Sequence, residues 1–270
     1  MANFTCSSKK CVLLRLQVEL ERRILCEYLL NSLFMRSNLK LKLFAFLSIL
    51  LLFAYSQTIL EPGIDRWTIK TSAANFIDNA NPKSVSLKTL IKLPLIDKEY
   101  SSNDYDEVLI PKKVGALKEG DIISTKGYLH LVALENSSND HRDGDYHIQL
   151  TLHPEWTDSC FIVEIPFEDF VSNTELKALC VKNRNFIKKR LLKDENKEPS
   201  GGGNIMQHEV YVKVTGQLFY DAIHASQMRN PNPAKRKYRG KKGNSKNPMH
   251  SYTAWEIHPV TNIEFAVKPK

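Results

Sequence analysis

Cysteine is scarce in this sequence, and its distribution excludes the common cysteine-based sites. Of five cysteines, only Cys160 and Cys180 lie beyond residue 56, and no pair has the CxxC spacing typical of zinc and redox sites. These two residues could form one disulfide in an oxidising compartment. The alternative is a pair of buried free thiols, because nothing in the sequence fixes the distance between them.

Most of the chain also lacks a strong excess of positive charge. The formal net charge is +8, but residues 1–56 hold eight of the 38 Lys/Arg and only three of the 30 Asp/Glu. Residues 57–270 therefore carry a net charge of only +3, which excludes a general nucleic-acid-binding surface. No motif identifies a reaction, although a hydrophobic content of 42% is sufficient for a sizeable core.

The apolar segment at residues 43–55 is shorter than a typical membrane span. It has thirteen residues interrupted only by Ser48, whereas a spanning helix needs about 20. Basic residues precede it and Ala54-Tyr55-Ser56 follows, which is the order of a signal peptide. We predict a signal peptide at residues 35–56, cleaved after Ser56. The alternatives are an uncleaved anchor at residues 43–60 in the cytoplasmic membrane and a buried core helix.

The remaining N-terminal parts follow from this prediction. Residues 1–34 are either the product of a mis-assigned start site, with Met35 as the true start, or a cytoplasmic extension. Residues 57–120 mix short apolar runs with Asn-, Pro- and acid-rich spacers, which predicts edge strands and loops. The exported protein would then be periplasmic or extracellular, with its main domain at residues 121–270.

Alternating apolar residues predict that this main domain is mainly β. Strand-like runs occur at residues 121–134, 145–152, 161–166, 209–222 and 254–266. A capping box at residues 172–175 starts a helix that should continue to about residue 192, and Gly127 suggests a bulge or bend in the first strand. The order βββαββ predicts an OB-fold-like five-stranded barrel, preceded by the N-terminal hydrophobic helix. Another small barrel or a sandwich is the alternative.

A long basic loop separates the last two predicted strands. Residues 223–252 contain eight Lys/Arg and no acid, and loops this long are usually functional or disordered. The loop could follow the phosphate or sulfate backbone of an anionic polymer with tyrosines available for stacking, contact a membrane surface, or be a solvated insertion. The predicted ligand-binding residues are Lys235, Arg236, Lys237, Tyr238, Arg239, Lys241 and Lys242.

Acidic and histidine residues occupy the strand faces opposite the predicted core, where we expect them to face solvent. Such residues can bind a divalent metal or act as general acids and bases. The sequence does not show whether they converge, and turn formation or backbone hydrogen bonding would also explain them. The candidate metal ligands are Asp143, Asp145, His147, Asp221, His224, Glu256 and His258, of which Asp145, His147 and His258 are the catalytic candidates.

Three segments together resemble a family of bacterial exported proteins without assigned activity. They are DGDYHIQL at residues 143–150, VYVKVTGQLFYDAIH at 210–224 and WEIHPVTNIEF at 255–265, similar to that family's GDxH, FYDxxH and EIHPV motifs. RWTIKT at 66–71 is similar to its N-terminal edge. The resemblance draws attention to the acid–histidine pairs in these motifs but implies no role for them. Two features depart from the family's pattern. One is the long insertion after His224, and the other is Tyr146, where a small aliphatic residue is expected.

Three functions are consistent with these features. The leading hypothesis is a non-enzymatic exported module that binds an anionic or oligomeric ligand, such as nucleic acid or polysaccharide, with the basic loop. The alternative is a divalent-metal-dependent hydrolase, such as a secreted nuclease, that uses Asp145, His147 and His258. The third is a structural envelope protein. OB-folds bind ligands across their second and third strands and the flanking loops, and both of these loops, residues 135–144 and 223–252, stand out in this sequence as polar and basic respectively.

Overall fold

The computed structural model describes residues 66–72, 81–96, 105, 107–135, 143–155, 159–242 and 249–268. These residues belong to one compact unit, Leu60–Lys270. The predicted extension at residues 1–34, the signal or anchor at 35–60 and the N-terminal hydrophobic helix lie outside the described residues. Within the described ranges, no helix has both the length and the apolar character needed to cross a bilayer.

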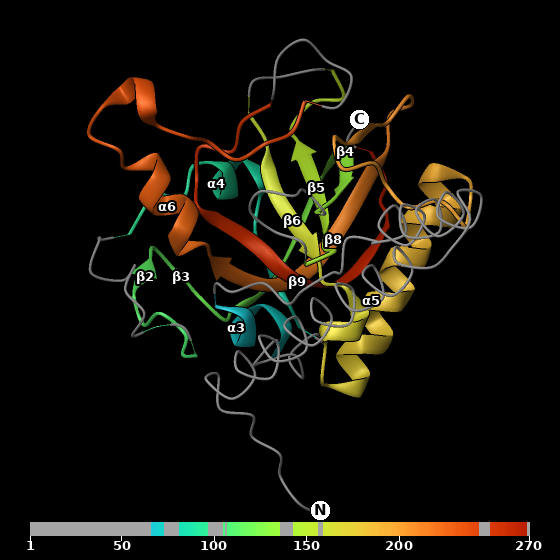
Figure 1. Cartoon of the computed structure of the whole chain (residues 1–270), viewed down its shortest axis with the longest axis horizontal. Coiled ribbons are helices and arrows are strands. Elements are labelled where there is room, and N and C mark those ends of the chain that lie inside the picture. The colour runs from blue at the N-terminus through green and yellow to red at the C-terminus, as the bar shows by residue number, and fades with distance from the viewer. Residues whose placement is uncertain are drawn as a thin grey trace, which may run out of the picture. The chain divides into compact units, whose positions relative to one another are not determined.

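Five strands form a closed barrel, which confirms the prediction of a mainly β domain (Figure 1). The strand order is β4–β5–β6–β9–β8, and β4 also pairs with β8 to close the ring. Strands β6 and β9 are parallel, whereas the other barrel pairs are antiparallel. This order fits the predicted OB-like arrangement at a coarse level. The barrel strands are β4 (Ile122–Leu134), β5 (Tyr146–Thr151), β6 (Phe161–Ile165), β8 (Tyr211–Tyr220) and β9 (Trp255–Phe265).

Strand β4 bends because its two halves pair with different neighbouring strands. Its first part pairs with β8 up to Tyr128, and its second part pairs with β5 from Tyr128 onward, with a register shift between Leu129 and Leu131. Gly127 lies at this transition, where an added Cβ would be 2.6 Å from Leu87 Cδ2 and 3.2 Å from the Thr151 carbonyl oxygen. The predicted bend in the first strand is therefore confirmed.

Gly216 provides a similar close approach between β8 and β9, whose register shifts on both sides of it. An added Cβ would be 2.3 Å from the Pro259 carbonyl oxygen and 2.5 Å from Ile257 Cγ2. Because backbone must move to accommodate it, we expect Gly216→Ala to lower the free energy of unfolding by about 2–3 kcal/mol in urea denaturation. Gly202→Ala is the matched control, since nothing lies within 4 Å of its added Cβ. Equal effects of the two substitutions would contradict this explanation.

The chain segment that connects β6 to β8 contains a helix, which packs along one side of the barrel (Figure 1). Helix α5 (Thr174–Phe186) begins at Asn173, whose side chain accepts a hydrogen bond from the Leu176 amide at 2.9 Å. It continues as a π-helix, η5 (Ile187–Leu192). The predicted helix and its end near residue 192 are thus confirmed. The 3-10 turn η4 (Glu168–Phe170) precedes it, and the two-residue strand β7 (Asn204–Ile205) follows.

The region predicted as edge strands and loops contains short helices as well. Helices α3 (Trp67–Ser72) and α4 (Leu87–Ile91) replace two of the predicted strand-like runs. The Ser86 side chain accepts a hydrogen bond from the Thr89 amide at 3.1 Å and so starts α4, which buries Leu87 and Leu90. Strand β1 (Lys83–Ser84) pairs with β4 of the barrel, while β2 (Lys113–Val114) and β3 (Leu117–Lys118) pair with each other.

Residues before the barrel are tied to it by a buried ion pair. The Arg66 guanidinium contacts both carboxylate oxygens of Glu119, at 2.5 and 2.7 Å, and donates to the Tyr220 carbonyl oxygen at 2.9 Å. Both side chains are at most 1% exposed. This pair fixes Arg66 and Glu119 against the barrel, within the same compact unit.

Candidate functional site

The barrel strands have an apolar inner face and a polar outer face. Ile148, Val163 and Ile257 belong to the hydrophobic core, whereas alternate positions carry His147 in β5, Glu164 in β6, and Glu256 and His258 in β9. His147 pairs with Glu164 across β5 and β6, and Ile162 pairs with Glu256 across β6 and β9. Residues distant in sequence therefore converge on one outer face. The acid–histidine cluster comprises Glu135, Asp143, Asp145, His147, Glu164, Asp221, Glu256 and His258.

His258 lies at the centre of this cluster. Its Nε2 is 3.3 Å from Asp145 Oδ2, and its Nδ1 is 3.1 Å from both Glu164 Oε2 and Glu256 Oε1. The imidazole is fully buried, and the Phe219 ring packs against it with 5.8 Å between ring centroids. Burial alone would lower the pKa of His258, but the hydrogen bonds to Asp145 and Glu164 outweigh it and raise the pKa. The surrounding carboxylates thus favour the protonated ring.

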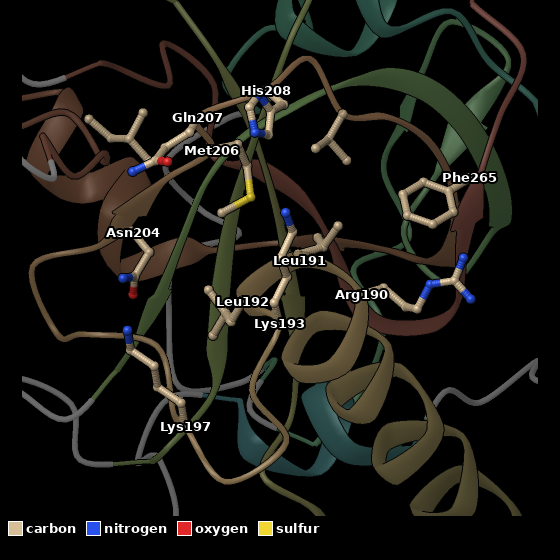
Figure 2. Close-up of a pocket in the computed structure, with 12 residues that line it drawn as sticks. Arg190, Leu191, Leu192, Lys193, Lys197, Asn204, Met206, Gln207, His208 and Phe265 are labelled. Carbon is tan, nitrogen blue, oxygen red and sulfur yellow. The ribbon is translucent and has the colours of Figure 1, made fainter.

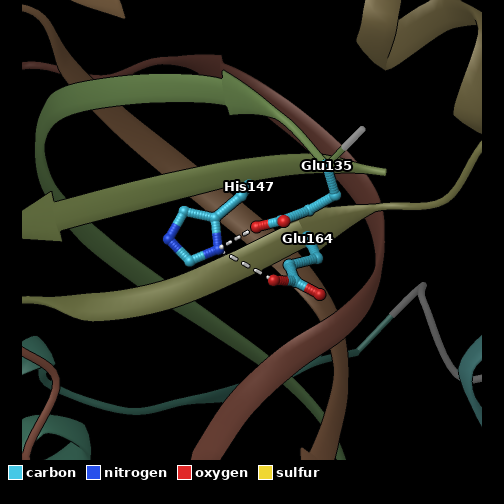
Figure 3. A group of neighbouring side chains, drawn as sticks. All are labelled: Glu135, His147 and Glu164. Atoms are coloured by element: carbon cyan, nitrogen blue, oxygen red, sulfur yellow. Dashed lines mark hydrogen bonds and ion pairs between the residues drawn. The ribbon is translucent and has the colours of Figure 1, made fainter. Parts of the chain in front are cut away.

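His147 makes a second set of contacts with acids from two elements (Figure 3). Its Nδ1 is 2.9 Å from Glu164 Oε1 and 3.2 Å from Glu135 Oε1. The other ring nitrogen, Nε2, is buried and forms no hydrogen bond with any described residue. Because buried polar atoms are usually paired, this nitrogen is a candidate for contact with a ligand.

Arg239 from the basic loop inserts into the cluster. Its guanidinium lies 2.5 Å from Glu164 Oε1 and 3.3 Å from Asp221 Oδ2, and it also forms an ion pair with Glu256. Burial would raise the pKa of Glu164, but Arg239 and the two histidines hold it well below its usual range. Arg239, predicted to contact an anionic ligand, instead pairs with three carboxylates of its own chain, and its side chain is only 8% exposed.

Lys241 is the second predicted ligand-binding cation with internal partners. Its amide donates to Gln149 Oε1 at 2.5 Å, and its ammonium group lies 3.1 Å from Glu135 Oε2. The loop thus covers the outer face of β5, and the cluster that we expected to face solvent is buried. The other predicted ligand-binding residues are exposed, namely Lys235, Arg236, Lys237, Tyr238 and Lys242.

Asp221 and His224 form a local pair at the start of α6 (Ala222–Met228). Asp221 Oδ1 accepts from the His224 amide at 2.9 Å, and its Oδ2 lies 2.6 Å from His224 Nδ1. Burial would raise the pKa of Asp221, but His224 and Arg239 lower it strongly. This pair therefore caps a helix and reaches the remaining cluster through Arg239.

Asp143 stands at the edge of the cluster. Its Oδ1 accepts a hydrogen bond from the Asp145 amide at 3.3 Å. Burial and the negative charge of Asp145 raise the pKa of Asp143 to about 8. Metal binding requires a deprotonated carboxylate and a neutral imidazole, so an ion would have to displace a proton from Asp143 and from His258 alike.

Two groups within the described residues have the geometry of metal ligands. In each of the sets Asp145–Glu164–His258 and Glu135–His147–Glu164, the candidate ligand atoms lie within 4.8 Å of one another. Asp145 Oδ2 and His258 Nε2 lie 3.3 Å apart and form no hydrogen bond with any other described residue. Carboxylate oxygen with imidazole nitrogen suits divalent ions such as Mn²⁺ and Zn²⁺. Glu164 belongs to both sets and would lie between two ions.

Comparisons with protein-family models, curated proteins and solved structures gave no match. The resemblance of residues 143–150, 210–224 and 255–265 to an exported family therefore remains a prediction. The interpretation of the cluster depends on its own geometry and chemistry.

Sequence reasoning omitted two of the most central acids. Glu164 is the only charged residue in β6, FIVEI, at a position whose neighbours are all apolar. An isolated acid within a buried strand is the signal that could have identified it. Glu135 follows β4 directly, at the start of the loop whose far end carries Asp143. Its position directly after the first barrel strand, opposite Asp143 at the other end of the same loop, is the signal that could have identified Glu135 as a member of the cluster.

The two cysteines beyond residue 56 are free, buried thiols. Burial raises the pKa of Cys160 and of Cys180 to about 12 in each case. The disulfide between them, one of the two interpretations of the sequence, is not formed. Neither thiol is suited to act as a nucleophile.

Proposed function

We propose that this protein is a divalent-metal-dependent hydrolase of an anionic polymer, with its metal centre on the outer face of β5, β6 and β9. The observation that carries the proposal is the convergence of Asp145, which precedes β5, with Glu164 of β6 and His258 of β9, each at most 3% exposed. An anionic ligand alone would be repelled by so many carboxylates, whereas a cation between them would offset their charge.

The cluster divides into groups with different tasks. Asp145, Glu164 and His258 would hold one ion, and Glu135 with His147 would hold a second that shares Glu164. A bound divalent ion lowers the pKa of a coordinated water and stabilises negative charge on the reacting group. With Nδ1 as its metal ligand, neutral His147 would carry its proton on Nε2, which is buried and has no hydrogen-bond partner among the described residues. This nitrogen could then donate a hydrogen bond to a bound substrate.

The surface next to the cluster supports a polymeric, phosphate-containing substrate. Tyr238 and Tyr252 are 36% and 47% exposed, and their ring centroids lie 5.0 Å apart. His250 packs within 6.0 Å of both rings. Exposed Lys235, Arg236 and Lys237 precede this aromatic group in the chain. Cations that follow phosphates and aromatic rings that stack on bases are together typical of single-stranded nucleic-acid binding.

The loops that contribute to the site agree with a finer interpretation of the fold as an OB-like barrel. The connection between β4 and β5 supplies Asp143, and Glu135 begins it; the connection between β8 and β9 supplies Asp221, Arg239 and Lys241. These are the two connections that flank ligands in OB-folds. An export signal at residues 35–56 would place the activity outside the cytoplasm.

The test is metal-dependent cleavage by the full chain. After treatment with a chelator, Mn²⁺, Mg²⁺, Ca²⁺ or Zn²⁺ is added back with a fluorescently labelled single-stranded DNA or RNA. Asp145→Asn and His258→Gln should each reduce cleavage at least about 100-fold, while circular dichroism shows that the fold is retained. Asp169→Asn, which removes a carboxylate that is 68% exposed, should have no effect. Failure of calorimetry to detect bound metal, together with no cleavage, would reject the proposal.

A binding module without catalysis is the second candidate. The observation that favours it is the exposed run of Lys235, Arg236 and Lys237 beside Tyr238. In that case, replacing the three cations with glutamine would weaken binding to single-stranded nucleic acid, and no metal would produce cleavage. The cleavage assay above therefore separates the two candidates.

A further inference from the structure

A pocket lies away from the acid–histidine cluster, between η5, β7 and the end of β9 (Figure 2). Its volume is about 390 Å³, within the range of small-molecule sites. It shares no residue with the cluster. Its apolar lining residues are Leu191, Leu192, Ile205, Met206, Val210 and Phe265.

Three cations border this pocket without a carboxylate among the lining residues. Arg190, Lys193 and Lys197 form no ion pair with any described residue, and the Arg190 guanidinium lies 5.3 Å from the centre of the Phe265 ring. Figure 2 shows the Lys193 side chain extending between Leu191 and Met206. The pocket thus combines an apolar floor with uncompensated positive charge.

Nearby acids do not neutralise these cations, because they pair with other residues. Glu195 pairs with Lys189 at 3.0 Å, and Glu198 pairs with Lys188 at 2.5 Å. Glu209 pairs with Lys268 at 2.5 Å. An anionic ligand would therefore meet positive charge in the pocket without displacing an existing ion pair of these acids.

The wall of the pocket has an unusual backbone. The six residues Ile187–Leu192 form a π-helix, which ends at Lys193 with φ 57°. Turns of π-helix occur frequently at functional sites. Favourable interaction with the helix C-terminus explains cations in the last turn, but it does not explain Lys197, which lies beyond the helix.

We infer that this pocket binds a small amphiphilic anion, with a phosphate or carboxylate head attracted to the rim by the combined charge of Arg190, Lys193 and Lys197 and an aliphatic chain over the apolar floor. Leu191, Leu192 and Met206 are flexible aliphatic side chains, half-buried against the core. They suit an aliphatic chain better than a planar ring, because Phe265, 48% exposed beside Arg190, is the one Phe, Tyr or Trp among the lining residues. This inference is independent of the metal centre.

The experiment uses the full chain and dodecyl phosphate below its micelle-forming concentration, with binding measured by calorimetry. Inorganic phosphate tests the head alone, dodecyl maltoside the chain alone, and adenosine monophosphate a planar alternative. We expect each of these three to bind at least about tenfold more weakly than dodecyl phosphate. Tighter binding of adenosine monophosphate would overturn the aliphatic assignment. Equal binding of dodecyl maltoside would overturn the role of the cations.

Variants locate the binding within the pocket. Arg190→Gln with Lys197→Gln should weaken binding of dodecyl phosphate at least about tenfold. The matched double variant Lys113→Gln with Lys118→Gln removes the same charge from exposed positions on β2 and β3 and should leave binding unchanged. The NMR signal of the Met206 methyl group should shift on titration, and Met206→Leu identifies it. An unshifted signal, or equal losses in both double variants, would reject the inference.

Discussion

Replacing Glu164 with glutamine is expected to abolish metal binding and to destabilise the fold. Glu164 lies within 2.5 to 3.1 Å of Arg239, His147 and His258, and it belongs to both candidate ligand sets. Its removal leaves Arg239 and His258 buried with less negative charge around them. We expect the free energy of unfolding to fall by about 3–5 kcal/mol, and metal affinity to fall at least about 100-fold.

Urea denaturation and calorimetric titration with Mn²⁺ measure the two effects of Glu164→Gln. Glu264→Gln is the matched control on β9, because Glu264 forms only a surface ion pair with Lys213 at 3.5 Å. Its expected cost is below about 1 kcal/mol, with metal affinity unchanged. A stable Glu164→Gln protein with undiminished metal affinity would show that the cluster is not a metal centre.

Arg239→Gln is expected to have opposite effects on stability and on metal affinity. The guanidinium offsets the charge of Glu164, Asp221 and Glu256, so its loss leaves several buried carboxylates close together. Without metal, the free energy of unfolding should fall by about 3 kcal/mol or more. With a competing cation removed, affinity for Mn²⁺ should rise by about tenfold or more.

Thermal unfolding with and without Mn²⁺ separates these effects, because a ligand that binds the folded state raises its stability. Metal should therefore stabilise the Arg239→Gln protein more than the parent. Arg236→Gln removes an exposed cation that donates to the Asn230 carbonyl oxygen, and it should change neither quantity. If Arg239→Gln weakened metal binding as Glu164→Gln does, Arg239 would hold the carboxylates in position for the metal and would not compete with the metal for them.

Local patterns in the sequence were sufficient to predict the barrel strands. The alternation of Tyr146, Ile148 and Leu150 with polar residues was evident, and β5 follows it with these three residues in the core. The parallel pairing of β6 with β9 joins residues more than 90 positions apart, and no local pattern specifies such a contact. The convergence of Asp145 with His258 depends on that pairing and needed the structure.

Composition misled the interpretation of the basic loop. A run of cations without acids suggests an exposed surface, but Arg239 and Lys241 pair with carboxylates on the barrel face and beside it. Those partners come from other parts of the chain, so the loop sequence alone could not reveal them. The prediction of edge strands and loops at residues 57–120 also missed helices α3 and α4, because short apolar runs fit a strand or a helix turn equally well.

The buried pair formed by Arg66 and Glu119 limits how far the chain can be trimmed. A version that begins at residue 121 would keep all five barrel strands but lose both members of the pair. A version that begins at residue 70 would leave the Glu119 carboxylate sealed inside without its guanidinium, although it still accepts hydrogen bonds from the amides of Ile110 and Tyr220. A version that retains Glu119 therefore has to start at or before Arg66, well ahead of the first barrel strand.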